Sequence, residues 1–393
     1  MNGKSRTWAE IDLNAALHNF QLAQKLTGGK PVMPVIKGDA HGHGAGVLGR
    51  FLEKHGAAAF AVACLSEAVE LREAGITVPV LILGYTDPSE AGELLRCRIT
   101  QSVFDSGYGK ELSREVMRLT DCTGTGETGF TGNRLCVHAK VDTGMTRTGF
   151  YAQKDAAAAA AEIAALGQLP GLSLTGIFTH YAAADVPEKE SFTAWQLENF
   201  KAVLKELKRT GTDPERLTIH ASNSAVILYH PESYFDMVRM GVMLYGMYPS
   251  DDYANRGELE PVLTLKTRVA QVKHVEKGAE VSYGCTYTAP REMDIAVAAA
   301  GYADSYPRAL SGKGAWAVIG GSRCAQIGRI CMDMCMFDVT GKDVKEGDEV
   351  ILYGKGGMSH ELTARLAGSI NCEHTCLLTK RVEKVYLGGG SQD

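Results

Sequence analysis

The segment from Pro34 to Gly44 contains the first residue that suggests covalent chemistry. The apolar run Pro34-Val35-Ile36 leads directly into Lys37, and glycine and histidine dominate the residues that follow. If the run is a buried strand, the Lys37 amine lies at its end, where loss of water favours an uncharged amine. Such an amine forms a Schiff base with an aldehyde cofactor. A lysine at a strand end is also common as a solvated rim residue, and Lys37 alone leaves both interpretations open.

Polar residues also follow or interrupt other apolar runs in the first 245 residues. They are Lys140, His180, the triplet Ser222-Asn223-Ser224, and Arg239. If the runs are parallel strands of a barrel, these side chains gather at the carboxyl ends of the strands, where barrel enzymes place their reactive groups. Chance does not easily explain so many polar groups at equivalent positions.

The elements that would position these side chains alternate between strand-like and helix-like segments. Apolar, β-rich runs predict strands at 31–36, 60–64, 79–84, 99–104, 134–141, 174–179, 216–221 and 237–244. Helical patterns lie between most of them, for example at 45–55, 66–74, 89–95, 155–166 and 192–210. Eight such units in roughly 250 residues predict an α/β fold with a parallel (β/α)8 barrel of the TIM type, and a doubly wound sheet is the alternative.

After Tyr248-Pro249 the pattern changes to short strands and glycine-rich turns. Strands are predicted at 265–275, 295–300, 315–319, 325–333 and 349–353. We therefore predict a barrel domain over residues 1–248 and a smaller, mostly β domain over 249–393. The Gly/Thr-rich stretch 122–132 is typical of a surface loop.

These segments together resemble the motifs of the alanine racemase family over nearly the whole chain. Lys37 and the residues after it resemble that family's cofactor-lysine motif. Further matches are WAEIDL at 8–13, HAKVDTGM at 138–145, TH at 179–180, HASNSA at 220–225, MVRMG at 237–241, VSYG at 281–284, GYADSYPR at 301–308 and GRICMD at 328–333. Each motif alone is weak evidence, whereas their number, order and spacing together are strong.

The resemblance implies a racemase that depends on pyridoxal 5'-phosphate (PLP) and interconverts L- and D-alanine, supplying D-alanine for peptidoglycan. Lys37 would bind PLP and act as one acid/base group. Tyr283 would be the second base, reaching the substrate from the partner subunit of a homodimer with shared active sites. Racemisation needs a proton removed from one face of the substrate carbon and another delivered to the opposite face, which two groups of this kind can do.

The family's cofactor contacts fall on further residues of the chain. Arg239 matches the arginine that donates to the pyridine nitrogen, and His180 would support it. Because arginine keeps its proton, the ring nitrogen would stay unprotonated, which disfavours side reactions. Ser224 and the backbone amides of Gly241 and Val242 match the family's phosphate site, where amides donate without carrying charge.

The resemblance also implies which residues bind the substrate. Lys140 and Arg147 match a pair in which the lysine is often carbamylated and gives the arginine an anionic partner. Arg147 and the Met332 amide would hold the substrate carboxylate, and Tyr302 would line the substrate site.

Two residues depart from the family pattern, and both fall in the predicted cofactor site. His41 and Lys380 stand where the family usually has tyrosines. Pocket size and polarity would change with these residues, so the substrate is less securely predicted than the reaction. The related serine racemases of vancomycin resistance differ in the same region, which makes serine an alternative substrate.

Two further functions compete with a racemase. A non-catalytic PLP-binding barrel protein would be a single domain, unlike this chain. A PLP-dependent decarboxylase on the same plan would need a cysteine-bearing catalytic loop and an acidic partner for the pyridine nitrogen, where this chain has Arg239.

Composition excludes other classes. The chain has a net charge of −5 and no long Lys/Arg run, so nucleic-acid binding has no electrostatic support. No apolar stretch approaches the ~18 residues that cross a bilayer, and no signal-peptide pattern is present, so we expect a cytoplasmic protein; a longer parent with a membrane part upstream is compatible with this. We expect its ten cysteines to be mostly reduced. Cys331/Cys335 and Cys372/Cys376 are poorly spaced for zinc, and no metal is predicted.

Overall fold

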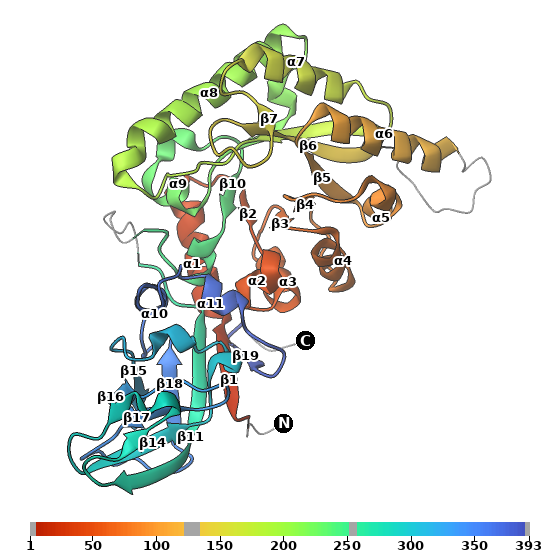
Figure 1. Ribbon diagram of the computed structural model, residues 1–393. Helices are drawn as coiled ribbons and strands as arrows, with labels where there is room; N and C mark the ends of the chain where they lie inside the picture. The colour runs from red at the N-terminus through yellow and green to blue at the C-terminus, as the bar shows by residue number, and fades with distance from the viewer. Residues whose placement is uncertain (1–4, 122–133, 251–257, 390–393) are drawn as a thin grey trace.

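The computed structural model describes residues 5–121, 134–250 and 258–389. The predicted loop 122–132 lies entirely within residues 122–133, outside this description. Figure 1 shows a large body of helices around strands, and below it a smaller body built mainly from strands. Buried apolar side chains of both bodies belong to one continuous hydrophobic core.

The large body is a closed parallel barrel. Its strands are β2 (Val32–Pro34), β3 (Phe60–Val62), β4 (Val80–Ile82), β5 (Ile99–Val103), β6 (Leu135–Asp142), β8 (Leu172–Phe178), β9 (Thr218–His220) and β10 (Val238–Met240). They pair in the order β3-β4-β5-β6-β8-β9, and β10 pairs with β2. Single bridges from Val35 to Ala61 and from His220 to Met237 close the ring. The predicted barrel is confirmed, with every predicted strand represented.

Helices and short helical turns follow the barrel strands. They are α2 (Lys37–His41), α3 (Ala45–Lys54), α4 (Leu65–Glu73), α5 (Ala91–Arg96), α6 (Ser106–Asp121), α7 (Ala156–Gly167), α8 (Glu190–Arg209) and α9 (Ser224–Tyr229). The examples of helices expected from the sequence did not include α2, α6, α9 or α1 (Leu13–Leu26). In α1 the polar Asn19 is buried and donates to the carbonyl oxygens of Leu244 and Glu260, which interrupts the apolar periodicity on the buried face. None of the helices in the described part of the chain is long and apolar enough to cross a membrane.

The smaller body is built on one sheet. Its strands run in the order β14 (Met293–Ala298), β17 (Cys335–Asp338), β16 (Ser322–Ile327), β15 (Trp316–Ile319), β18 (Glu349–Tyr353), β11 (Leu263–Val275), β1 (Thr7–Asp12) and β19 (Glu383–Leu387). Its helices are α10 (His360–Ala367) and α11 (Glu373–Cys376), and the short strands β12 (Glu280–Val281) and β13 (Tyr287–Thr288) form a separate pair. The predicted mostly β domain is confirmed as a fold.

Two details of this sheet differ from the sequence-based expectation. Strand β1, which we had placed with the barrel, pairs with β11 and β19 of the second sheet. The strand predicted at 325–333 was wrong beyond Ile327, because Gly328 has φ +65° and turns the chain out of the extended conformation. Residues 328–333 therefore lie outside the strand and form the loop that carries Met332.

Candidate active site

Lys37 lies just beyond strand β2, at the start of a left-handed turn. Gly38, Asp39, Ala40 and His41 all have φ between +51° and +61°. This conformation costs a non-glycine residue about 1–2 kcal/mol, so surrounding contacts must hold the turn. The Lys37 side chain is exposed in the single chain. The desolvation expected for its amine is therefore not supplied by this chain alone.

Two carboxylates hold the turn from opposite sides. Glu67 accepts hydrogen bonds from the backbone amides of Gly38 and Ala63, both at 2.7 Å, and so ties the turn to the end of β3. Asp39 accepts from the Ala45 amide at 2.8 Å and forms an ion pair with Lys384 of β19. The second sheet thus contacts the lysine segment directly. No sequence pattern indicated a role for Glu67, because its partners are backbone groups of other elements.

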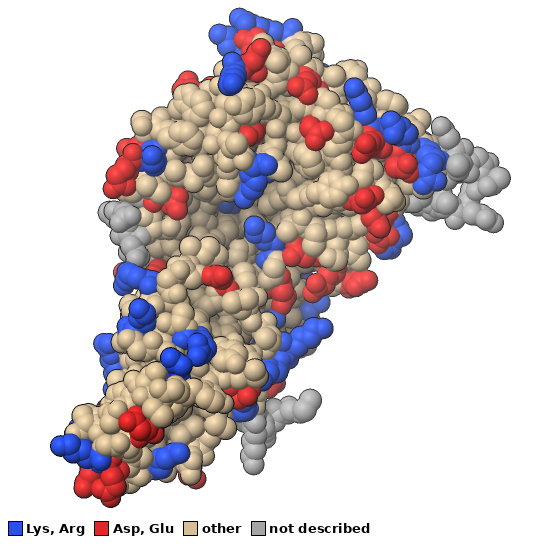
Figure 2. All heavy atoms as spheres, in the orientation of Figure 1, with Lys and Arg blue, Asp and Glu red and all other residues tan. Residues whose placement is uncertain are grey.

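The barrel strands bring cationic groups together near Lys37. Burial, and after it the charges of nearby cationic side chains, lower the pKa of Lys140 to about 8, while the charge of Asp142 opposes them. These cationic side chains are Arg147, Arg239 and Lys37. Lys140 also donates to the Thr148 hydroxyl at 2.5 Å. Figure 2 shows a hollow between the barrel and the smaller body, with Lys and Arg side chains on its rim. An excess of positive charge in a hollow favours an anionic ligand.

Arg239 occupies the centre of this group and is 3% exposed. Its guanidinium donates to the carbonyl oxygens of Thr179 and Ala221 and contacts Nδ1 of both His220 and His180, at 2.8 to 3.1 Å. Burial lowers its pKa to about 9, and among the described residues no carboxylate pairs with it. Burial also lowers the pKa of His180, and the charge of Arg239 adds to this. Arg239 is therefore a buried cation surrounded by neutral acceptors.

Ser224 and the segment after β10 form a polar cradle. The Ser224 hydroxyl oxygen accepts from the backbone amides of Gly241 and Met243, at 3.0 and 3.2 Å. A Cβ on Gly241 would lie 3.5 Å from that oxygen, which is an ordinary van der Waals contact. Val242 begins the 3-10 turn Val242–Tyr245. Hydroxyl and amide donors of this kind suit a phosphate group.

His41 stands in the turn after Lys37 and is buried against the Tyr245 ring, with ring centroids 4.7 Å apart. Its Nδ1 is buried and has no hydrogen-bond partner in the described part of the chain. Burial, and then the charge of Lys37, lower its pKa to about 4. A neutral imidazole with an unsatisfied nitrogen next to Lys37 is a candidate contact for a bound group.

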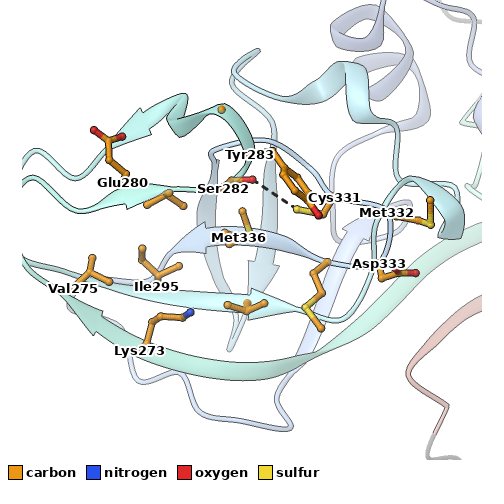
Figure 3. A pocket seen from close by; sticks show the side chains of 14 residues that line it. Lys273, Val275, Glu280, Ser282, Tyr283, Ile295, Cys331, Met332, Asp333 and Met336 are labelled. Carbon is orange, nitrogen blue, oxygen red and sulfur yellow. Dashed lines mark hydrogen bonds between the residues drawn. The ribbon is translucent and has the colours of Figure 1, made fainter.

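The remaining predicted residues lie on the smaller body. Tyr283 and Met332 line a cavity of about 750 Å³, and their side chains are 69% and 51% exposed (Figure 3). Tyr302 is 43% exposed, and its backbone amide donates to Cys331 in the Met332 loop. Lys380 is exposed and follows Thr379, whose hydroxyl donates to Ala303. Lys37 is not among the residues that line the cavity of Tyr283 and Met332, and in the described residues no hydrogen bond or ion pair joins it to this group.

The backbone that presents Tyr283 is strained. Ser282 has φ +69° and ψ −179°, a region that L-residues rarely occupy. Its hydroxyl donates to the Arg329 carbonyl at 2.6 Å. It also lies 3.7 Å from the Cys331 sulfur, and Figure 3 marks this second contact with a dashed line. These contacts fix the turn that projects Tyr283 into the cavity. Strain of this kind collects at functional sites.

No group of three or more His, Cys, Asp or Glu side chains within residues 5–121, 134–250 and 258–389 is arranged to hold a metal ion.

The fold and the site define a two-domain barrel enzyme whose polar groups gather at the carboxyl ends of the parallel strands. Family models for the alanine racemase N-terminal and C-terminal domains match residues 11–249 and 262–386. The chain is 43% identical to an alanine racemase of Desulforamulus reducens, over 98% of this chain and 100% of that protein. It is 38% identical to an alanine racemase of Methanococcus maripaludis, over 97% and 98% of the two chains.

Solved structures agree with these matches. An alanine racemase of Clostridium difficile 630 superposes with a TM-score of 0.88 at 37% identity, covering 98% of this chain and 97% of that one. An alanine racemase of Bacillus anthracis with bound L-Ala-P gives 0.86 at 31% identity, covering 100% and 97%. The chain belongs to the alanine racemase family, whose named members are isomerases.

Proposed function

We propose that this enzyme interconverts L- and D-alanine with PLP as its cofactor. The observation that carries the proposal is Arg239, a buried cation with only neutral acceptors, at a barrel mouth that also holds Lys37. A barrel-rim arginine in a structural role would normally pair with a carboxylate. We infer that D-alanine is made in the cytoplasm for peptidoglycan synthesis.

The residues at the mouth fit PLP. Lys37 would hold it covalently, Arg239 would face its pyridine nitrogen, and Ser224 with the amides of Gly241 and Val242 would bind its phosphate. His41, with its unsatisfied nitrogen, and His180 complete the predicted contacts of the barrel. When bound, PLP withdraws electrons from the substrate α-carbon and makes its proton removable.

Arg239 would tune this chemistry. With a pKa of about 9 its guanidinium is still protonated at neutral pH, so it donates and does not accept. A donor facing the pyridine nitrogen keeps that nitrogen unprotonated, which limits electron withdrawal and disfavours reactions other than racemisation. A carboxylate there would do the opposite, which separates the racemase from the decarboxylase alternative.

Lys140 and Arg147 would bind the substrate carboxylate region. With a pKa of about 8, a fraction of the Lys140 amine is uncharged near neutral pH. An uncharged amine adds carbon dioxide and releases a proton to form a carbamate. The carbamate would give Arg147 an anionic partner, and Arg147 and the Met332 amide would then hold the carboxylate.

The two-base step requires a second copy of the chain. Tyr283, Met332 and Tyr302 are exposed on the smaller body and would complete the barrel mouth of a partner subunit, with Lys380 near the entrance. Lys37 would then move the proton on one face of the substrate and Tyr283 on the other. The division into a barrel domain to residue 248 and a domain 249–393 that carries the second base is part of this proposal.

Two experiments test the proposal. Borohydride reduction of the PLP-loaded protein should fix the cofactor on Lys37, and a label on another lysine would contradict the cofactor assignment. Mixing a Lys37→Ala chain with a Tyr283→Phe chain should regenerate activity, because one hybrid site keeps both bases. No recovery despite proven subunit exchange would contradict the shared site.

Serine is the second candidate substrate, favoured by His41 and Lys380 at positions where the family usually has tyrosines. Rates of D/L interconversion measured side by side on alanine and serine decide between them. A higher kcat/KM for serine would replace alanine in the proposal and leave the reaction type unchanged.

A further inference from the structure

Arg239 is the last member of a buried chain of hydrogen bonds that begins on strand β6. Nδ1 of His138 lies 2.9 Å from Nε2 of His220, and Nδ1 of His220 lies 2.8 Å from a guanidinium nitrogen of Arg239. The three side chains are 8%, 0% and 3% exposed. They come from β6, β9 and β10, so the chain crosses the barrel interior.

The direction of every proton in this chain follows from its arginine end. A guanidinium only donates, so Nδ1 of His220 must accept and its proton must lie on Nε2. Nε2 of His220 then donates to Nδ1 of His138, which leaves the His138 proton on its own Nε2. Burial lowers the pKa of both histidines, which keeps both rings neutral as this arrangement requires.

Packing holds both rings in these orientations. The Phe178 ring stacks on His220 with centroids 4.8 Å apart and an interplanar angle of 6°. His138 lies against Gly176, where a Cβ would come within 2.5 Å of the imidazole ring. Only glycine at this position of β8 leaves room for the ring of His138.

We propose that His138 is a positioning residue: its Nδ1 accepts the hydrogen bond from Nε2–H of His220 and so holds that ring in place, which fixes the orientation of the Arg239 guanidinium toward the cofactor. The inference rests on the proposed function, because PLP is the group that Arg239 would address. If His138 offered no acceptor, His220 would lose the partner of its Nε2 proton and could turn, and Arg239 would lose one of its fixed acceptors.

Four variants of the full chain test this role. His138→Leu removes the acceptor, whereas His138→Asn keeps an oxygen close to the position of Nδ1. Gly176→Ala displaces the His138 ring without changing its chemistry. His230→Leu is the matched control, because His230 is also 8% exposed and contacts the carbonyl oxygen of Ala184 at 3.0 Å, outside the chain to Arg239.

The measurements are ¹⁵N NMR of histidine tautomers in the cofactor-free protein, the Kd for PLP from its absorbance, and the Tm. We expect the His220 proton on Nε2 in the wild type. His138→Leu and Gly176→Ala should weaken PLP binding by about tenfold, the effect of losing one buried hydrogen bond, and His138→Asn should restore most of it. His230→Leu should lower the Tm and leave the Kd unchanged.

The inference would be overturned by a His220 proton on Nδ1, or by a wild-type Kd for PLP in both His138→Leu and Gly176→Ala. Equal losses of PLP affinity in His138→Asn and His138→Leu would also overturn it, because they would indicate a general packing defect and not the loss of a hydrogen-bond acceptor. If His138→Leu fails to fold, the Kd of Gly176→Ala and the His220 tautomer in the wild type still test the role of His138. A wild-type protein that does not bind PLP contradicts the proposed function instead, and the NMR result remains a separate test.

Discussion

Replacing Tyr283 by phenylalanine removes one oxygen atom at a place where the fold does not depend on it. The side chain is 69% exposed in the single chain, and the described residues give its hydroxyl no hydrogen-bond partner. Surface substitutions away from caps and buried networks usually change stability by less than about 0.5 kcal/mol. The Tm and the Kd for PLP should therefore stay close to those of the wild type.

The catalytic effect should be far larger. A positioned acid/base group contributes about 10²–10⁴-fold to rate, which corresponds to roughly 3–5 kcal/mol of transition-state stabilisation. Racemisation should fall by that factor in both directions, because each direction needs both groups. Tyr85→Phe is the control, since Tyr85 is also a largely exposed tyrosine, at 57%, and lies on the barrel away from the cavity of Tyr283.

Exchange of the substrate α-proton in D₂O gives a sharper assay than the overall rate. Lys37 remains in the variant and should still exchange the proton of one enantiomer. The enantiomer whose proton faces Tyr283 should lose exchange by the full factor. Equal loss from both enantiomers, or no loss from either, would refute the assignment of Tyr283 as a base specific to one face.

Three further predictions follow from the same contacts. The pKa of Lys140 is about 8 in the folded chain and 10.5 in the unfolded chain, so burial of Lys140 should destabilise the fold fully below pH 8 and not at all above pH 10.5. Bicarbonate should raise the Tm at pH 7.5 by forming the carbamate, and a Lys140→Met variant should show no such rise in Tm. Gly42→Ala should destabilise the fold by more than about 3 kcal/mol in urea titrations, because Gly42 has φ +87° and the new Cβ would lie 2.0 Å from the Thr375 oxygen. The control Gly28→Ala, with φ +64° and open space around the residue, should destabilise the fold by only about 1–2 kcal/mol. Glu67→Gln should weaken PLP binding about tenfold at unchanged pH optimum, because an amide can accept from only one of the two backbone amides that the carboxylate now holds; a wild-type Kd would show that the turn after Lys37 does not need this contact.

The barrel could be predicted because its strands are local features. Most of its strands bury a short apolar run, and this shows directly in the sequence of segments such as Val32–Pro34 and Val80–Ile82. Parallel strands place their carboxyl ends at one edge, so the positions of Lys37, Lys140 and Arg239 in the sequence were sufficient to expect them together. Burial of Arg239 and the influence of Lys37 on the pKa of Lys140 agree with this expectation.

Other features depend on pairs of residues that no local pattern connects. Strand β1 joins the second sheet because Thr7 pairs with Thr267. The residue pattern of one strand does not identify the strand with which it pairs. The contact between His138 and His220 spans 82 positions and needs the barrel to close. The left-handed turn after Lys37 is held by groups from other elements, so its conformation could not be read from its own residues. The sequence by itself determined the elements and the chemistry at their ends, because burial and periodicity appear as patterns in short stretches of sequence. Only the tertiary structure decided the pairings, the buried hydrogen-bond chain and the cavity that Tyr283 lines without Lys37, because each depends on contacts between distant segments.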